Sequence, residues 1–202
     1  KTTTKETVAA VLGTRGTTFA TPRNENSQIG APLTILATPD DTAFLVLELG
    51  TSEPGELDRL GAIARPDVAV ITAAFAEHLE WLGSVAGVVA AETELLDHLR
   101  PGATAFVGSA EPLLLEAARK RTNVDVRAVG ERSDDDWRIA DVRLARDGTH
   151  FTLTGPGRAP RAWHVPLLGG PAAWSASFAI AVGSELGLDD DAIQRGLATV
   201  TA

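Results

Sequence analysis

The first residues of the chain carry side chains suited to phosphate chemistry. The segment Lys1-Thr2-Thr3-Thr4-Lys5-Glu6 is similar to the second half of a phosphate-binding loop, Gly-x-x-Gly-Lys-Thr-Thr-Thr, that leads directly into a helix. In such loops, backbone N–H groups at the helix N-terminus hold phosphate, the Lys reaches the terminal phosphates and the next hydroxyl binds Mg²⁺. The glycines are absent here, and a polar helix start explains the same residues.

A carboxylate and a histidine form the second candidate group. Glu48 lies at the end of an apolar run of strand length, residues 42–49. Ligands of doubly wound sheets bind at the carboxyl ends of strands, and a buried carboxylate there needs a cation or hydrogen-bond donors. Mg²⁺ is the natural partner. His78 follows a second apolar run, residues 68–72, by six positions, so we expect it to converge with Glu48 near the helix that begins at Lys1.

The remaining polar and aromatic candidates also suit structural roles. Asn24 and Asn26 are, taken alone, ordinary loop amides that cap turns. Trp174 could stack on a purine, but an aromatic residue on an Ala-rich helix also suits a core position. The acidic run at residues 134–136 is typical of a solvated turn. Without a spaced carboxylate or histidine partner, the other histidines are interpreted as structural or surface residues: His98, His150 and His164.

An α/β pattern supplies the elements that position these residues. Residues 2–12 have apolar positions at helix spacing, and Gly13 ends the pattern. Apolar runs at 42–49, 68–72 and 103–107 alternate with helical patterns at 54–64, 84–99 and 111–121. Such alternation predicts a mostly parallel sheet flanked by helices, with the near-continuous apolarity of buried strands.

The pattern changes after Val124. Shorter strands are predicted at 137–144, 149–153 and 162–167, joined by an Asp147-Gly148 turn and a Gly-rich turn at 155–157. They form a small antiparallel cluster. Two closing helices follow at 172–186 and 190–200, with Asp189 as the expected cap of the second.

Composition limits the class of protein. The chain has 202 residues, 44% of them hydrophobic, which suits one compact domain spanning residues 1–202. A net charge of −9 argues against nucleic acid as a partner, because that binding needs a clustered basic face. The absence of cysteine permits the cytoplasm, and no apolar stretch is long enough for a membrane helix. We expect a cytoplasmic protein without a membrane partner, and the first residue, Lys1, suggests excision from a longer protein.

Three further segments carry a family resemblance. Residues 21–34, Thr-Pro-Arg-Asn-Glu-Asn-Ser-Gln-Ile-Gly-Ala-Pro-Leu-Thr, resemble a stretch of the Mur ligases that add D-alanyl-D-alanine. Leu47-Glu48-Leu49-Gly50 followed by Gly55-Glu56 is similar to that family's Glu-Leu-Gly strand end, and residues 77–84 to its Ala-His-Leu-Glu-x-Phe-Gly-Ser element. Together with the opening segment, four landmarks occur in the family's order. The chain therefore resembles the central, ATP-binding domain of a Mur ligase.

The resemblance implies a site and a reaction. Lys1 would hold the γ-phosphate of ATP, with Thr2 and Glu48 at a first Mg²⁺ and His78 with Glu92 at a second. Thr3 belongs to the same phosphate loop, while Asn24 and Asn26 border the nucleotide-sugar and phosphate cleft. Glu92 stands where the family carries a carbamylated Lys. A substrate carboxylate would form an acyl phosphate, and an amino acid or dipeptide amine would displace the phosphate. In the full-length protein the partners would be a nucleotide-sugar peptide and that amine.

Departures from the family pattern leave alternatives open. The family's Asn-x-Asp near adenine falls on Gly108 and Ala110, and its His-Asn-x-x-Asn falls on Pro171, Ala172 and Ser175. A non-catalytic Mur-like binding or regulatory domain with a degenerate nucleotide site is therefore the competing hypothesis. A ligase of the same fold acting on another substrate, such as a folate, is a third. The isolated domain is expected to be inactive.

Overall fold

A computed structural model describes residues 1–75 and 79–201 of the chain. These residues form two compact units that alternate along the sequence. The first unit contains residues 1–20, 38–46 and 129–202, and the second contains residues 21–37 and 47–128. Each unit is described by itself.

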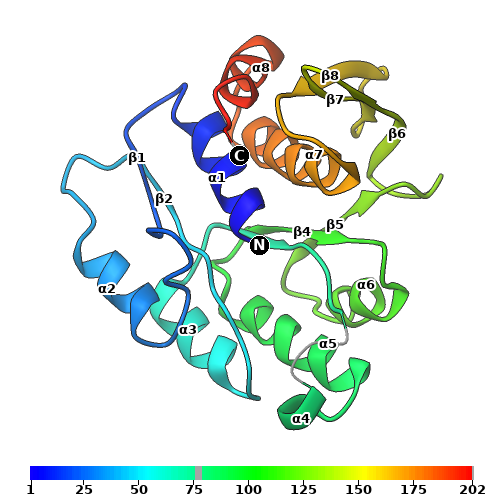
Figure 1. Ribbon diagram of the computed structural model, residues 1–202. Helices are drawn as coiled ribbons and strands as arrows, with labels where there is room; N and C mark the ends of the chain where they lie inside the picture. Colours follow the sequence, from blue (N-terminus) through cyan, green and yellow to red (C-terminus); the bar gives the residue numbers. More distant parts are fainter. Residues whose placement is uncertain (76–78, 202) are drawn as a thin grey trace. The chain divides into compact units, whose positions relative to one another are not determined.

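The helices of the first unit pack closely because two glycines face one valine. Helix α1 (Thr2–Leu12) packs against α7 (Gly170–Glu185) and α8 (Asp190–Leu197) (Figure 1). Val11 is fully buried at this contact. A Cβ on Gly196 would lie 2.5 Å from the Val11 Cα atom, and one on Gly183 would lie 2.9 Å from Val11 Cγ1. The α1 backbone can therefore approach both helices only where side chains are missing.

The strands of the first unit confirm the predicted antiparallel cluster. Strands β6 (Trp137–Ala145), β7 (Gly148–Thr154) and β8 (Arg161–Val165) pair antiparallel, and α7 packs against all three. The end of β5 (Asp125–Gly130) pairs parallel with the start of β6. A separate two-stranded parallel sheet joins β1 (Thr18–Ala20) to β2 (Phe44–Val46).

The second unit has a parallel strand pair at its core. Strand β3 (Val68–Ile71) pairs parallel with β4 (Thr104–Gly108), and every residue of β4 is buried. Helix α5 packs against α6, and α6 packs against β4. The surrounding helices are α2 (Gly30–Leu36), α3 (Glu56–Ala64), α4 (Leu79–Leu82), α5 (Val85–Thr93), the 3-10 helix η1 (Glu94–His98) and α6 (Pro112–Arg119).

The larger sheet has the strand order β3-β4-β5-β6-β7-β8, and β5 continues from one unit into the other. The predicted α/β class, a mostly parallel sheet flanked by helices with a small antiparallel cluster, is confirmed. The predicted side-chain cap on α8 is also present, because the Asp189 carboxylate accepts a hydrogen bond from the Ala192 N–H at 2.7 Å. Ser84 and Glu111 cap α5 and α6 in the same way.

Several predicted elements differ from the structure. The apolar run at 42–49 supplies only the three residues of β2, which lies in the two-stranded sheet and is not fully buried. The helical pattern at 84–99 divides into α5 and η1. Four elements had no prediction: β1, α2, α4 and β5. In the part of the chain that the structure describes, no helix is long and apolar enough to cross a membrane.

Candidate functional site

The first turn of α1 presents its polar residues in two directions. Lys1 and Thr3 are exposed and Thr2 is half-buried. Lys1 is the N-terminal cap of the helix, and among the described residues no side chain caps this end by a hydrogen bond. The first N–H groups of a helix have no intrahelical acceptor, so this end suits an anion such as phosphate.

The inward-facing residues of α1 anchor the helix. The Thr4 hydroxyl lies 3.1 Å from the Ser175 hydroxyl of α7, and both side chains are buried. The Thr7 hydroxyl donates to the Thr3 carbonyl at 2.7 Å. These contacts hold the first turn of α1 in place on the buried side of the helix. They also place Ser175, one of the altered family positions, in the packing between two helices of the first unit.

Glu48 has the most unusual environment of the candidates in the second unit. It lies two residues beyond β2, and it is only 5% exposed. Its backbone N–H donates to the Thr21 hydroxyl at 2.9 Å, and its Oε1 accepts from the Asn26 side-chain amide at 2.6 Å. Its Oε2 is buried and accepts no hydrogen bond from the described residues. A buried carboxylate oxygen without a donor is costly, so this atom is suited to a cation.

Gly50 holds Asn26 against Glu48. The Gly50 N–H donates to the Asn26 carbonyl at 2.8 Å. A Cβ on Gly50 would lie 2.8 Å from Asn26 Oδ1, closer than a Cβ can approach an oxygen. A side chain here would therefore push the amide away from Glu48, which gives a physical reason for glycine at the end of the Glu-Leu-Gly segment.

Asn24 and Asn26, in the loop before α2, have different surroundings. Asn24 is exposed, and its carbonyl accepts the Asn26 N–H at 2.8 Å. Arg23 has a φ of 50°, so this turn includes a left-handed residue. The turn directs the Asn26 side-chain amide to Glu48, and a turn-capping role of the two asparagines stays a prediction. A role of Asn24 and Asn26 at a nucleotide cleft stays a prediction.

Glu56 ties the same loop to α3. Its Oε1 accepts from the Gln28 side chain at 2.8 Å, and its Oε2 accepts from the backbone N–H groups of Ser52 and Glu53. Arg59 in turn donates to Gln28 Oε1 at 2.7 Å. Burial raises the pKa of Glu56, but these hydrogen bonds and the Arg59 charge outweigh it and lower the pKa below its ordinary value.

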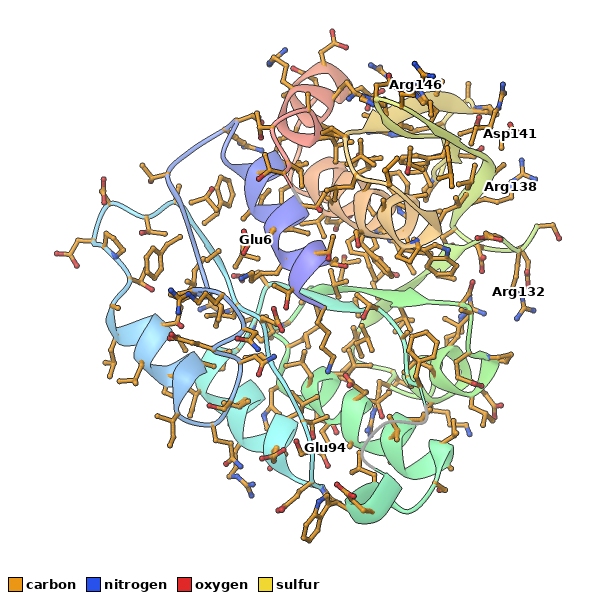
Figure 2. The ribbon with its side chains drawn as sticks, viewed as in Figure 1. Glu6, Glu94, Arg132, Arg138, Asp141 and Arg146 are labelled. Carbon is orange, nitrogen blue, oxygen red and sulfur yellow. The ribbon has the colours of Figure 1, made fainter. Side chains whose placement is uncertain are left out.

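Glu92 and Glu94 lie close in sequence but differ in their surroundings. Glu92 is buried on α5 beside the core residues Val88 and Val89. Its assignment to a metal stays a prediction. Glu94, labelled in Figure 2, accepts from the backbone N–H groups of Gly55 and Asp58 and so caps the start of α3. His78 lies outside the described residues.

Four of the altered family positions carry no polar side chain: Gly108, Ala110, Pro171 and Ala172. A Cβ on Gly108 would lie 2.1 Å from the Thr72 carbonyl oxygen, so this backbone excludes any side chain there. Pro171 is exposed and Ala172 is buried. Trp174 is half-buried rather than in the core, and its indole N–H donates to Glu131 at 3.0 Å.

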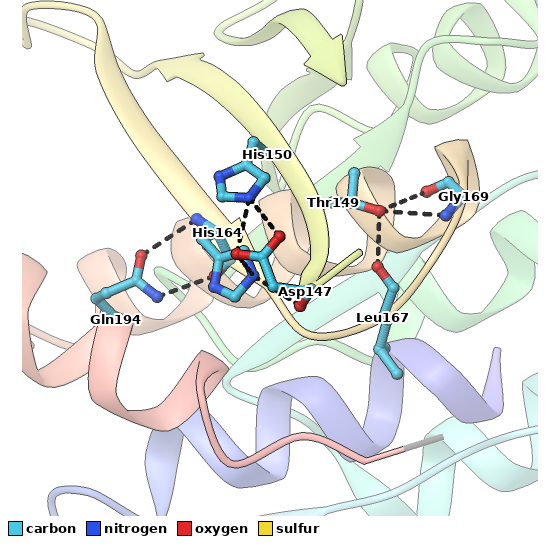
Figure 3. A network of polar contacts seen from close by, with 7 residues as sticks. All are labelled: Asp147, Thr149, His150, His164, Leu167, Gly169 and Gln194. Carbon is cyan, nitrogen blue, oxygen red and sulfur yellow. Dashed lines mark hydrogen bonds and ion pairs between the residues drawn. The ribbon is translucent and has the colours of Figure 1, made fainter. Parts of the chain in front are cut away.

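Histidine partners were missed in the sequence. His98 contacts the Asp58 carboxylate at 2.7 Å. His150 and His164 are cross-strand neighbours, and both approach Asp147 (Figure 3). The interpretation that they have no carboxylate or histidine partner was therefore wrong. The spacing of Asp147 to His150 across an Asp-Gly turn was the available signal, because strand register then brings His164 opposite His150.

Comparison with known proteins gives a consistent result. The family model described as the Mur ligase middle domain matches residues 1–183. The UDP-N-acetylmuramoyl-tripeptide–D-alanyl-D-alanine ligase of Bacillus subtilis is 38% identical over 198 residues, which cover 98% of this chain and 42% of the relative. The chain thus spans less than half the length of this relative.

Solved structures share the fold. The crystal structure of MurF from Acinetobacter baumannii superposes with a TM-score of 0.88 at 25% identity, covering 100% of this chain and 44% of that one. The MurF ligase of Thermotoga maritima in complex with ADP gives a TM-score of 0.87 at 26% identity, covering 100% of this chain and 46% of that one.

Proposed function

Because this chain belongs to the Mur ligase middle-domain family, we propose that it is the ATP-binding part of an ATP-dependent amide ligase of peptidoglycan precursor synthesis. A relative that matches 98% of the chain is a UDP-N-acetylmuramoyl-tripeptide–D-alanyl-D-alanine ligase. The proposed substrates are accordingly a nucleotide-sugar peptide and the dipeptide D-alanyl-D-alanine, with ATP as the energy source.

The observation that carries the proposal is the buried carboxylate of Glu48. One of its oxygens accepts a hydrogen bond from Asn26 and the other has no donor in the described part of the chain. A residue used only for packing would gain nothing from such a charge, since burying an unpaired carboxylate destabilises a fold. A hard divalent cation that prefers oxygen ligands, such as Mg²⁺, accounts for it.

The proposed reaction has two steps. An oxygen of the substrate carboxylate attacks the γ-phosphorus of ATP, the bond to the β-phosphate oxygen breaks and ADP leaves, which gives an acyl phosphate. The amine nitrogen then attacks the acyl carbon, phosphate leaves with the bonding pair, and the nitrogen loses a proton to form the amide. Both steps depend mainly on positioning and on neutralising phosphate charge.

The residues of this chain have separate proposed roles. Lys1 neutralises the γ-phosphate, while the N–H groups that begin α1 and the hydroxyls of Thr2 and Thr3 bind phosphate oxygens. Glu48, oriented by Asn26, provides a metal ligand, and His78 and Glu92 are proposed ligands of a second ion. Bound Mg²⁺ would supply charge neutralisation across the phosphates.

The base side of the nucleotide is proposed to contribute little. Gly108 admits no side chain, and Ala110, Pro171 and Ala172 offer no side-chain hydrogen bonds. Neutral hydrogen bonds contribute about 0.5 to 1.5 kcal/mol each, so their loss weakens both affinity and the preference for adenine. Submicromolar ATP binding by the 202-residue chain, with clear preference over GTP, would contradict this assignment.

A ligase assay tests the function directly. The chain is produced as a fusion with the regions of the Bacillus subtilis relative that it does not span. Phosphate release is then measured with the nucleotide-sugar tripeptide, D-alanyl-D-alanine, ATP and Mg²⁺. We expect release only when both substrates are present. Glu48→Gln should lower kcat by roughly 100-fold or more, the scale of losing one group that stabilises transition-state charge. The exposed Glu116→Gln on α6 is the control.

Three results would count against the proposal. Phosphate release that ignores the dipeptide would indicate a nucleotidase, and ligation unaffected by Glu48→Gln would remove the metal role of Glu48. Binding of nucleotide without any turnover by the complete protein would favour a non-catalytic Mur-like domain.

A further inference from the structure

A second group of metal-ligating side chains lies in the first unit, at the turn between β6 and β7. Among the described residues, Asp147, His150 and His164 form the one group of three such side chains whose ligand atoms all lie within 4.8 Å of one another. Figure 3 shows the two imidazoles and the carboxylate directed toward a common point. The phosphate chemistry proposed above makes no use of them.

The strand register creates this group. His150 of β7 and His164 of β8 are paired residues, and their ring centroids are 4.5 Å apart. Asp147 precedes β7, and its carboxylate lies 3.1 Å from His150 Nε2 and 3.7 Å from His164 Nε2. Two ligands of a tetrahedral ion with bonds of about 2.0 to 2.1 Å lie about 3.3 Å apart. The observed distances bracket that value.

The backbone around the group is fixed from two sides. The Gln194 side chain on α8 donates to the His164 carbonyl at 2.9 Å and accepts the His164 N–H at 3.3 Å. Gly148 has a φ of 139°, and a Cβ there would lie 2.2 Å from the Val165 carbonyl oxygen. Only glycine allows the turn to bring Asp147 this close to β8. Rigid backbone beneath the ligands is what a preformed ion site requires.

We propose that Asp147, His150 and His164 bind one borderline transition-metal cation, Zn²⁺ in the first instance, independently of the phosphate site. Imidazole ligands favour Zn²⁺, Ni²⁺ and Cu²⁺ over Mg²⁺, which prefers oxygen ligands. The side chains are 45% exposed for His150, 30% for His164 and 63% for Asp147. Water can therefore complete the coordination and the ion can enter from solvent. An imidazole whose Nε2–H now bonds to Asp147 must present that nitrogen without its proton, which moves to Nδ1 of a neutral ring or is released to solvent from an imidazolium.

Bound metal would connect the β6–β7 turn to β8 and hold the hairpin closed. In the absence of metal, His150 and His164 already hydrogen-bond to the Asp147 carboxylate and carbonyl, respectively. The fold therefore does not depend on the ion. We expect the metal-free chain to be folded and the ion to raise its Tm by binding the folded state alone.

The test is calorimetric titration of the metal-free 202-residue chain with ZnCl₂ in the presence of excess Mg²⁺. We expect one ion per chain that Mg²⁺ does not displace. His150→Gln and His164→Gln should each weaken binding by roughly 100-fold or more, because even loss of a supporting partner weakens metal sites by roughly 10- to 100-fold. His98→Gln, a histidine bonded to Asp58 outside the group, is the matched control and should bind as the parent does.

Two further measurements keep the result interpretable. Thermal unfolding in chelator establishes whether each variant is folded. If a histidine variant does not fold, Asp147→Asn provides a substitute whose side chain has nearly the same shape as the original. Co²⁺ added in place of Zn²⁺ should give visible d–d absorption that the histidine variants lack. Absence of saturable Zn²⁺ binding, or equal affinity in the parent and both histidine variants, would overturn the proposal.

Discussion

Glu48 and Asp147 are two carboxylates beside polar partners, and they differ in what their surroundings provide. Glu48 is 5% exposed, and one of its oxygens has no hydrogen-bond donor among the described residues. Asp147 is exposed, and both of its carboxylate oxygens approach His150. Water can also reach Asp147. The first carboxylate therefore has an uncompensated buried oxygen, while the oxygens of the second are compensated by histidine and water.

This difference predicts different energetics for the two proposed cation sites. A buried carboxylate oxygen without a donor destabilises the metal-free protein, and cation binding would relieve this destabilisation. An exposed carboxylate with satisfied hydrogen bonds causes almost no such destabilisation. An ion that binds there must therefore compete with protons and water. Stability measurements on the metal-free chain should consequently move in opposite directions when the two carboxylates are neutralised.

The largest change in stability is expected at Gly50, which packs against Asn26 and so helps to position it beside Glu48. Gly50→Ala places a methyl group 2.8 Å from Asn26 Oδ1 and displaces the amide from Glu48. Overpacking and loss of a charged hydrogen bond together should lower the free energy of unfolding by about 3 kcal/mol. Urea denaturation measures this. Gly170→Ala, where a Cβ meets no atom within 4 Å, is the control, and equal stability of the two variants would contradict the steric argument.

A smaller change of opposite sign is expected at Glu48 itself. Glu48→Gln removes the buried charge but keeps an acceptor for Asn26. Relief of an unpaired charge outweighs the new unsatisfied amide donor, so without Mg²⁺ the free energy of unfolding should rise by about 1 to 2 kcal/mol. Thermal unfolding in chelator measures the change. A clear loss of stability would mean that Glu48 is compensated in the empty protein, and the contrast with Asp147 would disappear.

Glu56 provides an intermediate case, half-buried but fully partnered. Glu56→Gln should lower the free energy of unfolding by about 1 kcal/mol at neutral pH, because its hydrogen bonds from Ser52 and Glu53 lose their charge. The folded-state pKa of Glu56 is below its ordinary value of 4.5. The carboxylate therefore stabilises the fold above pH 4.5, and this contribution is lost as the pH falls through the folded pKa.

Denaturation of the parent and the Glu56→Gln variant between neutral pH and pH 3 checks both parts. The difference between the two proteins should shrink as the solution becomes more acidic. Glu116→Gln, on an exposed residue paired only with Lys120 in the described contacts, should show a smaller difference at every pH. If the difference in free energy of unfolding between the two proteins is unchanged near pH 3, the Glu56 charge is not the source of that difference.

The smallest effect is expected at Asp147. The hydrogen bond from His150 lowers the pKa of Asp147 below its ordinary value of 3.8. Its stabilising contribution is thus present above that value and lost as the pH falls through the folded pKa. Because the group is exposed, Asp147→Asn should change the Tm less than the variants of Glu48 and Glu56 do. NMR titration of the carboxyl carbon checks the pKa, and an unshifted value would contradict the His150 contact.

Secondary structure could be predicted where local pattern and packing agree. The apolar spacing at Val8, Val11 and Leu12 predicted α1 with its observed bounds, and the Asp147-Gly148 turn predicted the β6–β7 hairpin. Helix α2 had no prediction, and it holds Pro32 in its first turn, where the missing N–H has no acceptor anyway. The run at 42–49 was overextended because apolar residues beyond Val46 suggested a continuing strand.

The candidate site could be predicted only in part for a related reason. The sequence identifies Glu48 as a carboxylate after an apolar run, but its bond to Asn26 joins residues 22 positions apart. The exclusion of side chains at Gly50 and Gly108 depends on where other backbone segments lie. His150 and His164 become partners only through strand register. Each of these contacts is a property of tertiary structure that no local pattern contains.

The contact of α1 with α7 and α8 also has a consequence for the timing of folding. Val11 is enclosed by Gly183 and Gly196, so its partners are made long after it. At about 5 to 20 residues per second, the roughly 160 residues between α1 and α7 take about 8 to 30 seconds to synthesise. During that interval the apolar face of α1 has no α7 to cover it. The first unit therefore completes its packing only near the end of synthesis of this segment, and α1 is exposed to solvent until then.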